Sequence, residues 1–486
     1  MIATITPQTP FPIPSMRRIQ RLHFVGIGGS GMNGIAEVCK NLGYEVTGSD
    51  QQYSSVIERL EQLGVSVAIG HVAEQVEGAD VVIVSTAIDA HNPEYQAAQA
   101  LGIPIVPRAM MLAELMRFRH GIAVAGTHGK TTTTSIIVAI FEQAGYDPTY
   151  VIGGILNQAG RSAQLGKSRF FVVEADESDA SFHHLQPMVS VVTNIDLDHM
   201  DTYGGDPAEL EQNFATFVQR LPFYGLVVCC IDDERVRRCL PQFRRPALTY
   251  GFSKEAQYRC VSWQQTGLQS EILLEREGHG DLRFTLNLPG QHNVLNAIAA
   301  IAVATEEGIE DHAIVAALQQ FQGVNRRFTT YLNKCLHDQP LTLVDDYGHH
   351  PQEVAAVIAA ARLAWPKRRL LLVFQPHRYS RTRDLYEDFV QVLSAVDGLI
   401  MLKEYAAGEQ PIVKADSKAL CASLRRRGLE PCYAQDFNEL KTCLQQRLQN
   451  DDIVIFQGAG DVGRFAQQVI QMLTPIKRTD SHAASS

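Results

Sequence analysis

The stretch Gly126-Thr127-His128-Gly129-Lys130-Thr131-Thr132 decides the fold of this chain. An apolar run, Ile122 to Ala125, precedes it, and a segment with a helical pattern, Thr133 to Gln143, follows it. A strand, a glycine loop and a helix in this order direct backbone N–H groups of the loop and of the helix N-terminus at anionic oxygens. The stretch therefore predicts a phosphate loop that binds ATP.

Two side chains of this loop have predicted roles. Lys130 is expected to reach the β- and γ-phosphates, and the Thr131 hydroxyl is expected to hold Mg²⁺. The full motif has a glycine five residues before Gly129, where this chain has Val124, so only the shorter Gly-x-x-Gly-Lys-Thr form is present. The alternative is a glycine turn followed by a chance Lys-Thr pair. The position of the loop directly after a strand favours ATP binding.

Composition limits the class of protein. A chain of 486 residues is expected to form two to four domains, and 45% hydrophobic with 20% charged residues is typical of a globular protein. A net charge of −10 argues against a general nucleic-acid binder. The nine cysteines are scattered, with no Cys-x-x-Cys, which predicts reduced thiols in a cytoplasmic protein and no zinc site.

The two ends of the chain are expected to be disordered. Residues 1–18 carry prolines at positions 7, 10, 12 and 14 and lack the apolar core of a signal peptide, so they are interpreted as an extension. The tail, 476–486, is interpreted in the same way. No apolar run approaches the roughly 18 residues of a membrane span, so no membrane partner is expected.

Residues 19–117 alternate short apolar runs with helical patterns, which indicates a parallel sheet with helices on its faces. The turn after the first strand matches Gly-x-Gly-x-x-Gly at Gly26, Gly28 and Gly31, and Asp50 follows the second strand. This pattern predicts a diphosphate at a helix N-terminus and an acid that binds ribose, without identifying the nucleotide. A tight turn with no ligand remains the alternative.

Residues 118–328 form a second predicted domain, which the phosphate loop opens. Two further strands end in clusters of acids: Glu174 to Asp179 follows one, and Asn194 to Asp201, which contains His199, follows the other. Because Mg²⁺ prefers carboxylate and hydroxyl oxygens, clusters of this kind beside a phosphate loop predict a metal–phosphate centre. Each cluster alone is weaker evidence, since acidic loops are usually only solvated.

The end of this domain contains hairpins and a helix. Alternating patterns from Tyr258 to Leu286 are typical of hairpins. An alanine-rich helix then begins near Gly290, and Asn293 and Asn296, three residues apart, share one of its faces. Helix capping is the alternative role for these two asparagines.

Residues 329–475 form a third predicted domain. A strand at 341–344 precedes Asp345-Asp346-Tyr347-Gly348-His349-His350-Pro351, and a strand at 370–374 precedes a segment with His377, Arg378 and Arg381. Guanidinium groups at the carboxyl end of a strand suit capture of carboxylate or phosphate; solvated surface charge is the alternative. A second Gly-x-Gly-x-x-Gly, at 458–463, is interpreted as a tight turn.

These motifs, in this order, resemble the Mur ligases over residues 19–475, and within the family they resemble the alanine-adding branch. The resemblance implies an α/β protein of three domains. These are a Rossmann-like N-terminal domain for a UDP-sugar, a central P-loop ATPase domain with a parallel sheet and a small antiparallel part, and a C-terminal Rossmann-like domain for an amino acid. It also implies a cytoplasmic ligase of peptidoglycan synthesis, active in cell wall biogenesis and thereby in cell shape and cell division.

The resemblance further implies roles for individual residues. The UDP-sugar is expected to contact Gly26, Gly28, Gly29, Ser30, Gly31, Met32 and Asp50, and ATP is expected to contact Gly126, Thr127, His128, Gly129, Lys130, Thr131, Thr132, Asn293, Asn296, Arg327 and Asp345. Two Mg²⁺ ions are expected, one on Thr131 and Glu174 and one on His199. The alanine pocket is expected to contain Tyr347, His349, Arg378 and Arg381, with His349 also a candidate base for the amine.

The implied reaction joins L-alanine to the lactyl carboxylate of UDP-N-acetylmuramate with ATP, through an acyl phosphate. Later ligases of the pathway carry a carbamylated lysine on the helix after Asp198-His-Met-Asp201, and here that helix, 207–219, contains no lysine. Three readings compete: a ligase for murein tripeptide, an NAD-dependent dehydrogenase, and a scaffolding NTPase. A monomer or weak homo-oligomer is expected, with hinges near residues 118 and 328 that allow the site to close.

Overall fold

The computed structural model describes residues 14–29, 31–157, 160–336 and 338–475. Ser30, the tail 476–486 and most of the predicted extension 1–18 therefore lie outside the described residues. The chain divides into two compact units. The first contains the described residues up to Gln264, with Glu271–Asn287 and Asn293–Gln322. The second contains Gln265–Ser270, Leu288–His292 and the described residues from Gly323 onward.

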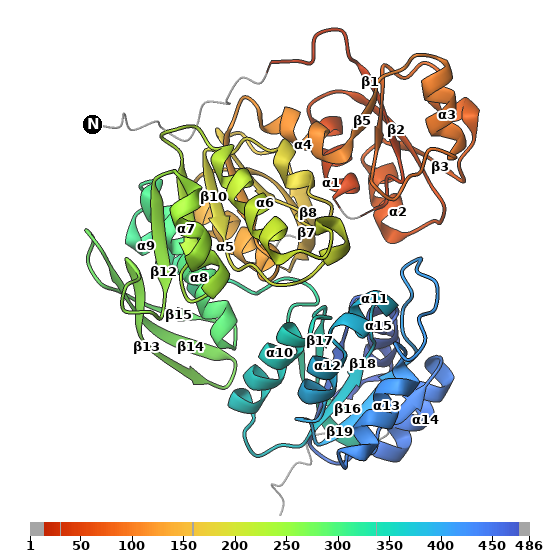
Figure 1. Ribbon diagram of the computed structural model, residues 1–486, viewed down its shortest axis with the longest axis vertical. Coiled ribbons are helices and arrows are strands. Elements are labelled where there is room, and N and C mark those ends of the chain that lie inside the picture. The colour runs from red at the N-terminus through yellow and green to blue at the C-terminus, as the bar shows by residue number, and fades with distance from the viewer. Residues whose placement is uncertain (1–13, 30, 158–159, 337, 476–486) are drawn as a thin grey trace, which may run out of the picture. The chain divides into compact units, whose positions relative to one another are not determined.

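The first sheet is parallel throughout and has the strand order β3-β2-β1-β4-β5. Figure 1 labels four of its strands, β1, β2, β3 and β5. Alternate residues of β4 pack into two different clusters: Val81 and Ile83 into one, Val82 and Val84 into the other. Both faces of the sheet are therefore covered, as a parallel sheet requires. Its elements are β1 (Arg21–Val25), α1 (Met32–Asn41), β2 (Glu45–Asp50), α2 (Ser55–Gln62), β3 (Ser66–Ile69), η1 (Ala73–Val76), β4 (Val81–Val84), α3 (Pro93–Ala100), β5 (Ile105–Pro107) and α4 (Arg108–Met116).

The second sheet has ten strands in the order β15-β14-β13-β12-β11-β10-β6-β9-β7-β8. Its centre is parallel, and β8 at one edge runs antiparallel to β7. The predicted hairpin region forms the three strands at the other edge (Figure 1). The strands are β6 (His120–Ala125), β7 (Thr149–Leu156), β8 (Arg161–Gln164), β9 (Phe170–Glu174), β10 (Val189–Val192), β11 (Leu226–Cys230), β12 (Ala247–Gly251), β13 (Tyr258–Thr266), β14 (Gln269–Arg276) and β15 (Leu282–Leu286).

Helix α5 (Lys130–Gln143) follows the phosphate loop and is almost entirely buried, which explains its run of Ile, Val and Phe residues. The predicted helix at 207–219 is α6 (Pro207–Gln219), with Pro207 in its first turn and the Asp206 carboxylate accepting from the backbone N–H of Ala208. The remaining helices of this part are η2 (Ser181–His184), η3 (Met200–Tyr203), α7 (Glu234–Phe243), α8 (Gln291–Glu306) and α9 (Asp311–Gln320).

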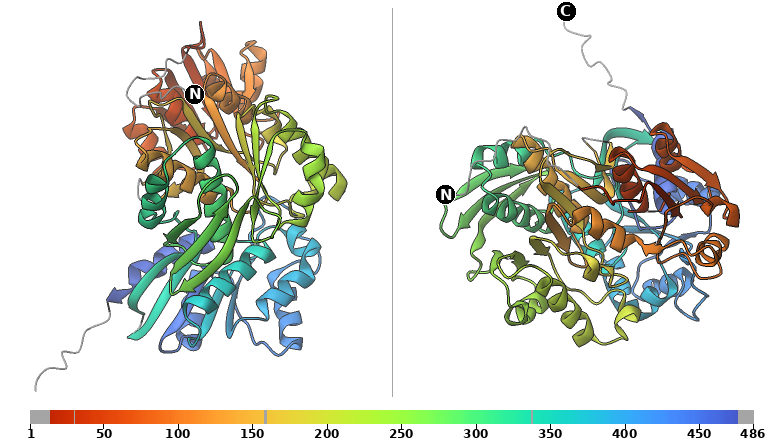
Figure 2. Two further views of the ribbon diagram at one scale, coloured as in Figure 1. Left: turned by 90° about the vertical axis from the view of Figure 1, so that its left-hand side faces the viewer. Right: turned by 90° about the horizontal axis from the view of Figure 1, so that it is seen from above.

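The third sheet lies in the second unit and has the order β20-β19-β18-β21-β17-β16-β22. Leu370 and Leu372 of β18 pack with α10, α12 and α13, whereas Leu371 and Val373 pack with α14 and α15, so helices cover both faces (Figure 2). Its strands are β16 (Thr329–Leu336), β17 (Gln339–Asp346), β18 (Leu370–Phe374), β19 (Gly398–Leu402), β20 (Cys432–Ala434), β21 (Asp452–Gln457) and β22 (Thr474–Pro475). Its helices are α10 (Pro351–Ala364), α11 (Tyr379–Asp384), α12 (Tyr386–Leu393), α13 (Ser417–Arg426), α14 (Phe437–Arg447) and α15 (Val462–Met472).

The structure confirms the predicted α/β class, with one sheet in each of the three predicted domains. Two local expectations are also confirmed. Pro351 begins α10, where His350 and Glu353 form a capping box. Gly458 and Gly460 lie in the turn from β21 into α15, and Gly463 lies in the first turn of that helix. The guanidinium of Arg326 packs against Gly463 and donates to the Gly458 carbonyl (2.6 Å).

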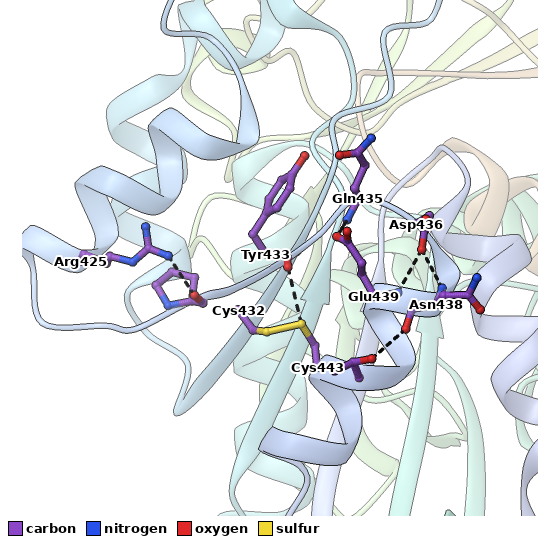
Figure 3. The surroundings of a disulfide bond; sticks show 10 residues. Arg425, Cys432, Tyr433, Gln435, Asp436, Asn438, Glu439 and Cys443 are labelled. Carbon is purple, nitrogen blue, oxygen red and sulfur yellow. Dashed lines mark hydrogen bonds between the residues drawn. A yellow bond between two sulfur atoms is a disulfide. The ribbon is translucent and has the colours of Figure 1, made fainter.

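The prediction that every cysteine is a reduced thiol is wrong for one pair. Cys432 of β20 and Cys443 of α14 form a disulfide, and the Cys443 sulfur also lies near the Tyr433 carbonyl (Figure 3). The pairing depends on how α14 packs against β20, which the spacing of 11 residues does not reveal. Seven other cysteines are free. No helix in the described part of the chain is long and apolar enough to cross a membrane.

Candidate active site

The phosphate loop lies between the two acidic clusters of the first unit. Strand β6, which leads into the loop, pairs in parallel with β9 on one side and with β10 on the other. Because neighbouring parallel strands end at the same edge of a sheet, Glu174 at the end of β9 and the Asn194–Asp201 segment after β10 flank the loop. The topology brings together the three motifs from which the metal–phosphate centre was predicted.

The loop needs both of its glycines. Gly126 and Gly129 have φ angles of 127° and 83°, and a Cβ on Gly126 would collide with Thr193. The segment after β10 holds the loop in place, since the backbone N–H of His128 donates to the Asn194 side chain (2.8 Å). Helix α5 begins at Lys130, so the N–H groups of its first turn have no partner within the helix. These are the groups that bind phosphate oxygens in such loops.

The residues predicted to hold Mg²⁺ fit a hard cation. The Thr131 hydroxyl lies 3.2 Å from Oε2 of Glu174, and Oε1 of the same carboxylate accepts from the N–H of Gly153 (2.8 Å). A hydroxyl and a carboxylate at this separation offer two oxygen ligands of the type that Mg²⁺ prefers. His199 stands in the loop after β10 with a left-handed backbone (φ 54°), and its Nε2 lies 3.6 Å from Asp198. Its predicted role as a metal ligand stays a prediction.

Lys130 has a partner that the sequence reasoning missed. Its ammonium forms a 2.6 Å ion pair with Glu177. Burial raises the pKa of the Glu177 carboxyl to about 7, although the positive charge of Lys130 opposes that shift. Burial also disfavours the charged form of Lys130, but the carboxylates of Glu177 and Asp176 outweigh it and raise the lysine pKa. Glu177 belongs to the predicted acidic cluster Glu174 to Asp179, but its orientation toward the lysine is a property of the folded loop.

The two asparagines lie in the first two turns of α8, which begins at Gln291. Asn296 accepts from the Thr133 hydroxyl (3.2 Å) and donates to Asn293 (3.3 Å). A Cβ on Gly129 would collide with the Asn296 side chain, so this helix closes against the phosphate loop. Asn296 therefore does not cap the helix. The predicted contact of the two asparagines with adenine stays a prediction.

The first glycine loop is shaped by the end of β2. Gly26 and Gly31 have positive φ angles, 75° and 79°, and the N–H of Gly28 donates to the Asp50 carboxylate (2.9 Å). Met32 opens helix α1, whose N-terminus therefore faces the loop. This arrangement suits a diphosphate at the helix N-terminus, with Asp50 beside it.

A cavity of about 260 Å³ lies in the first unit, between the strand ends of the first sheet and the segment after β9. Arg108 lines the cavity, and its guanidinium donates to Asp176 (3.2 Å). The cavity therefore adjoins the acidic segment Glu174 to Asp179, which also contacts Lys130. The sequence reasoning missed Arg108, although an arginine directly after a strand is a recognisable signal. The cavity is lined by Val84, Ser85, Thr86, Pro107, Arg108, Ala109, Asp179, Ala180, Ser181 and His184.

In the second unit, the end of β17 is a cluster of charges and one aromatic ring. Asp345 is fully buried and accepts from Nε of Arg326 (3.1 Å), while Asp346 accepts from the N–H of Phe328 (2.9 Å). The guanidinium carbons of Arg326 and Arg327 lie 5.3 and 5.1 Å from the centre of the Tyr347 ring. The predicted contact of Asp345 with ribose would require this buried pair to open, and it stays a prediction.

His377 lies close to residues of the predicted amino-acid pocket. Its ring contacts His349, in the loop after β17, and Tyr405, in the loop after β19. The His377 ring lies 5.4 Å from His349 and stacks on Tyr405 at the same distance. Arg381 is only 6% exposed, and its guanidinium donates to the His377 carbonyl (3.2 Å), which fixes the backbone of His377. The Arg378 side chain, in contrast, is 41% exposed, and its Nη1 lies 4.0 Å from Oε1 of Glu409.

Three models of the Mur ligase family match this chain in order. The Mur ligase catalytic domain matches residues 21–120, the Mur ligase middle domain matches residues 124–304, and the domain described as Mur ligase, glutamate ligase domain matches residues 326–460. Each match covers most of the strands of one of the three sheets.

Solved structures agree with these matches. A UDP-N-acetylmuramate-alanine ligase from Thermotoga maritima is 27% identical, covers 93% of this chain and 98% of its own, and superimposes with a TM-score of 0.80. A UDP-N-acetylmuramate:L-alanyl-gamma-D-glutamyl-meso-diaminopimelate ligase from Neisseria meningitides is 30% identical over 63% of this chain and 100% of its own, with a TM-score of 0.58. A murein peptide ligase from Psychrobacter arcticus, 22% identical over 93% of this chain and 98% of its own (TM-score 0.69), shares the fold. The chain belongs to the Mur ligase family.

Proposed function

We propose that this chain is an ATP-dependent ligase that joins L-alanine to the lactyl carboxylate of UDP-N-acetylmuramate in the cytoplasm, as a step of peptidoglycan precursor synthesis. The observation that carries the proposal is the Thr131–Glu174 pair beside the Lys130 loop, because it offers Mg²⁺ and triphosphate oxygens adjacent sites. The likeness to the Thermotoga maritima ligase, over nearly the whole of both chains, supports alanine as the amino acid.

In the first step, a lactyl carboxylate oxygen attacks the γ-phosphorus of ATP, the bond to the β,γ-bridging oxygen breaks, and ADP leaves. This transfer needs positioning and charge stabilisation more than covalent help from the protein. Lys130 and the first-turn N–H groups of α5 supply positive charge toward the transferred phosphoryl group. When bound, Mg²⁺ on Thr131 and Glu174, with a second ion on His199, would neutralise charge on the phosphate oxygens.

In the second step, the neutral amine of L-alanine attacks the acyl carbonyl, the amide forms and phosphate leaves. The amine must first lose a proton, and His349 is the proposed acceptor. Arg378 is the proposed partner of the alanine carboxylate, because its guanidinium is exposed at the end of the segment after β18. Tyr347 and Arg381 complete the proposed pocket, and Arg327, Asp345, Asn293 and Asn296 are the proposed contacts of ATP.

The UDP-sugar is proposed to bind the first glycine loop and the adjacent cavity. Gly26, Gly28, Gly29, Gly31 and Met32 would receive the diphosphate, and Asp50 the ribose. Arg108 is also proposed to contact the UDP-sugar, because it lines the cavity. It pairs with Asp176, and the next residue, Glu177, pairs with Lys130.

A second candidate is a ligase that attaches a murein tripeptide to UDP-N-acetylmuramate, favoured by the 30% identity to the Neisseria meningitides enzyme. One assay separates the two: phosphate release with Mg-ATP and UDP-N-acetylmuramate, compared for L-alanine, glycine, L-serine and the tripeptide L-alanyl-γ-D-glutamyl-meso-diaminopimelate. The proposal expects the highest kcat/KM with L-alanine. A higher value with the tripeptide would transfer the assignment to the second candidate.

A further inference from the structure

Every N–H of the Lys130 ammonium faces an acceptor. Nζ donates to the carbonyl oxygens of Gly126 (2.6 Å) and Thr127 (3.2 Å) and to Oε2 of Glu177 (2.6 Å). A lysine ammonium has three N–H donors, so these acceptors occupy all of them. A phosphate can bind to Lys130 only if it replaces one of the three.

Glu177 is the partner that a phosphate would replace. The two carbonyls belong to the loop backbone, whose course is fixed by the left-handed conformations of Gly126 and Gly129. The carboxylate is a side chain and is negatively charged, so a triphosphate that arrives beside it is repelled. Exchange of carboxylate for phosphate on the ammonium removes that repulsion and leaves the loop unchanged.

The carboxylate of Glu177 is presented to Lys130 by a braced segment. Glu177 is 4% exposed, and its backbone carbonyl accepts from the Tyr203 hydroxyl and from the N–H of Ala180 (3.0 Å). The neighbouring Thr202 hydroxyl donates to the Ser178 carbonyl (2.7 Å). The segment after β9 is thus tied to η3, and Glu177 extends from it to the lysine.

The adjacent acid, Asp176, provides an internal comparison. Its carboxylate lies in the same segment and its charge acts on Lys130, but it is bonded to Arg108 (3.2 Å) and to the Ser178 hydroxyl (2.7 Å). Asp176 and Glu177 therefore place similar charge near the phosphate loop, while Glu177 alone of the two is bonded to the lysine.

We propose that Glu177 is a positioning residue that holds Lys130 in the nucleotide-free protein and releases it to the β- and γ-phosphates of ATP. The inference rests on the proposed function, since it assumes that the loop binds ATP. The carboxylate keeps the ammonium beside the loop before ATP arrives. Because its bond to the lysine must break on binding, it also weakens the affinity for the triphosphate.

The test is the dissociation constant of the β,γ-imido analogue of ATP with Mg²⁺, measured by calorimetry on the full chain and on three variants. Glu177→Gln keeps the shape and removes the charge. Glu177→Asp keeps the charge and withdraws it from the lysine by one methylene. Asp176→Asn removes an equal charge that is not bonded to Lys130. AMP, which lacks the β- and γ-phosphates, is titrated in parallel, and thermal unfolding checks that each variant is folded.

The proposal expects both Glu177 variants to bind the analogue more tightly, by about tenfold, which corresponds to roughly 1.4 kcal/mol. It expects Asp176→Asn to match the wild type within about twofold, and AMP affinity to be the same throughout. If Glu177→Gln and Asp176→Asn increased the affinity for the analogue equally and Glu177→Asp did not, the cause would be the loss of any nearby negative charge. That result would overturn the proposal. Unchanged or weaker binding by both Glu177 variants would also overturn it. Failure of the wild type to bind the analogue would instead remove the proposed function.

Discussion

The hydroxyl of Thr131 lies 3.2 Å from Oε2 of Glu174, although the two residues are 43 positions apart in the chain. Thr131 lies in the first turn of α5, which follows β6, and Glu174 ends β9, so the parallel pairing of β6 with β9 produces the contact. This pair of oxygens is the proposed Mg²⁺ site, and Lys130, the residue before Thr131, is the proposed phosphate ligand.

Replacing the lysine should abolish ligation. Lys130→Ala is expected to lower the rate at least about 100-fold, because a preorganised positive group near the transferred phosphoryl is lost. The initial rate of phosphate release measures this, and thermal unfolding verifies the fold. The exposed Lys254, changed to Ala, serves as the control and should keep the wild-type rate. A near-normal rate in Lys130→Ala would remove the role assigned to the loop.

Glu174→Gln should change the metal requirement. The variant keeps the shape of the side chain but loses the charge that attracts Mg²⁺, so the Mg²⁺ concentration for half-maximal rate is expected to rise by about 10- to 100-fold. A Mg²⁺ titration at saturating ATP measures the shift. Glu209→Gln, an exposed change on α6, should leave the curve in place. An unshifted curve for Glu174→Gln would mean that this carboxylate does not bind the ion.

Arg378→Ala should affect the amino acid selectively. The loss of a charge-assisted bond to a carboxylate is expected to raise the KM for L-alanine at least about tenfold, with the KM for ATP nearly unchanged. Steady-state kinetics with each substrate varied in turn separate the two constants. Arg383→Ala is the matched control, because Arg383 lies on α11, which begins directly after Arg378, and pairs with Asp384. Equal effects of Arg378→Ala on both constants would argue against an amino-acid pocket here.

A buried carboxylate on helix α3, which packs against the first sheet, should make the free energy of unfolding depend on pH. Burial alone would raise the pKa of Glu94, but hydrogen bonds from His23, Ser49 and His71 outweigh it and lower that pKa. Stability from the ionised group is thus present above about pH 4.3, the usual glutamate value, and is lost as pH falls through the lower folded pKa. Glu94→Gln should cost about 3 kcal/mol at pH 7 by urea unfolding, and less in acid. A cost that is independent of pH, or equal to that of the exposed Glu58→Gln, would contradict this.

The presence of the disulfide can be tested by counting reactive thiols before and after reduction. With nine cysteines in the chain and one pair oxidised, denatured protein should react with seven equivalents of an alkylating agent before reduction and with nine after it. Mass spectrometry gives both numbers, and a proteolytic peptide joining Cys432 to Cys443 would locate the bond. Nine equivalents before reduction would show that the expectation of free thiols holds in solution.

Local patterns made the phosphate loop predictable, because the strand, the glycines and the helix are consecutive and each has its own signal. The acidic clusters were predictable as groups, since each follows an apolar strand. What could not be predicted depends on packing between distant segments. Asn296 reaches the loop from another helix, Glu177 rather than its neighbours turns toward Lys130, and Arg381 is buried whereas Arg378 is partly exposed. Residue type alone does not distinguish such neighbours.

The measurement that tests the central claim most directly follows oxygen from the sugar to the phosphate. UDP-N-acetylmuramate carrying ¹⁸O in its lactyl carboxylate is incubated with Mg-ATP and L-alanine, and the released phosphate is analysed by mass spectrometry. Ligation through an acyl phosphate predicts that each phosphate released contains one ¹⁸O atom, with the alanyl product formed in equal amount. Phosphate without ¹⁸O, or phosphate released without an amide product, would contradict the account.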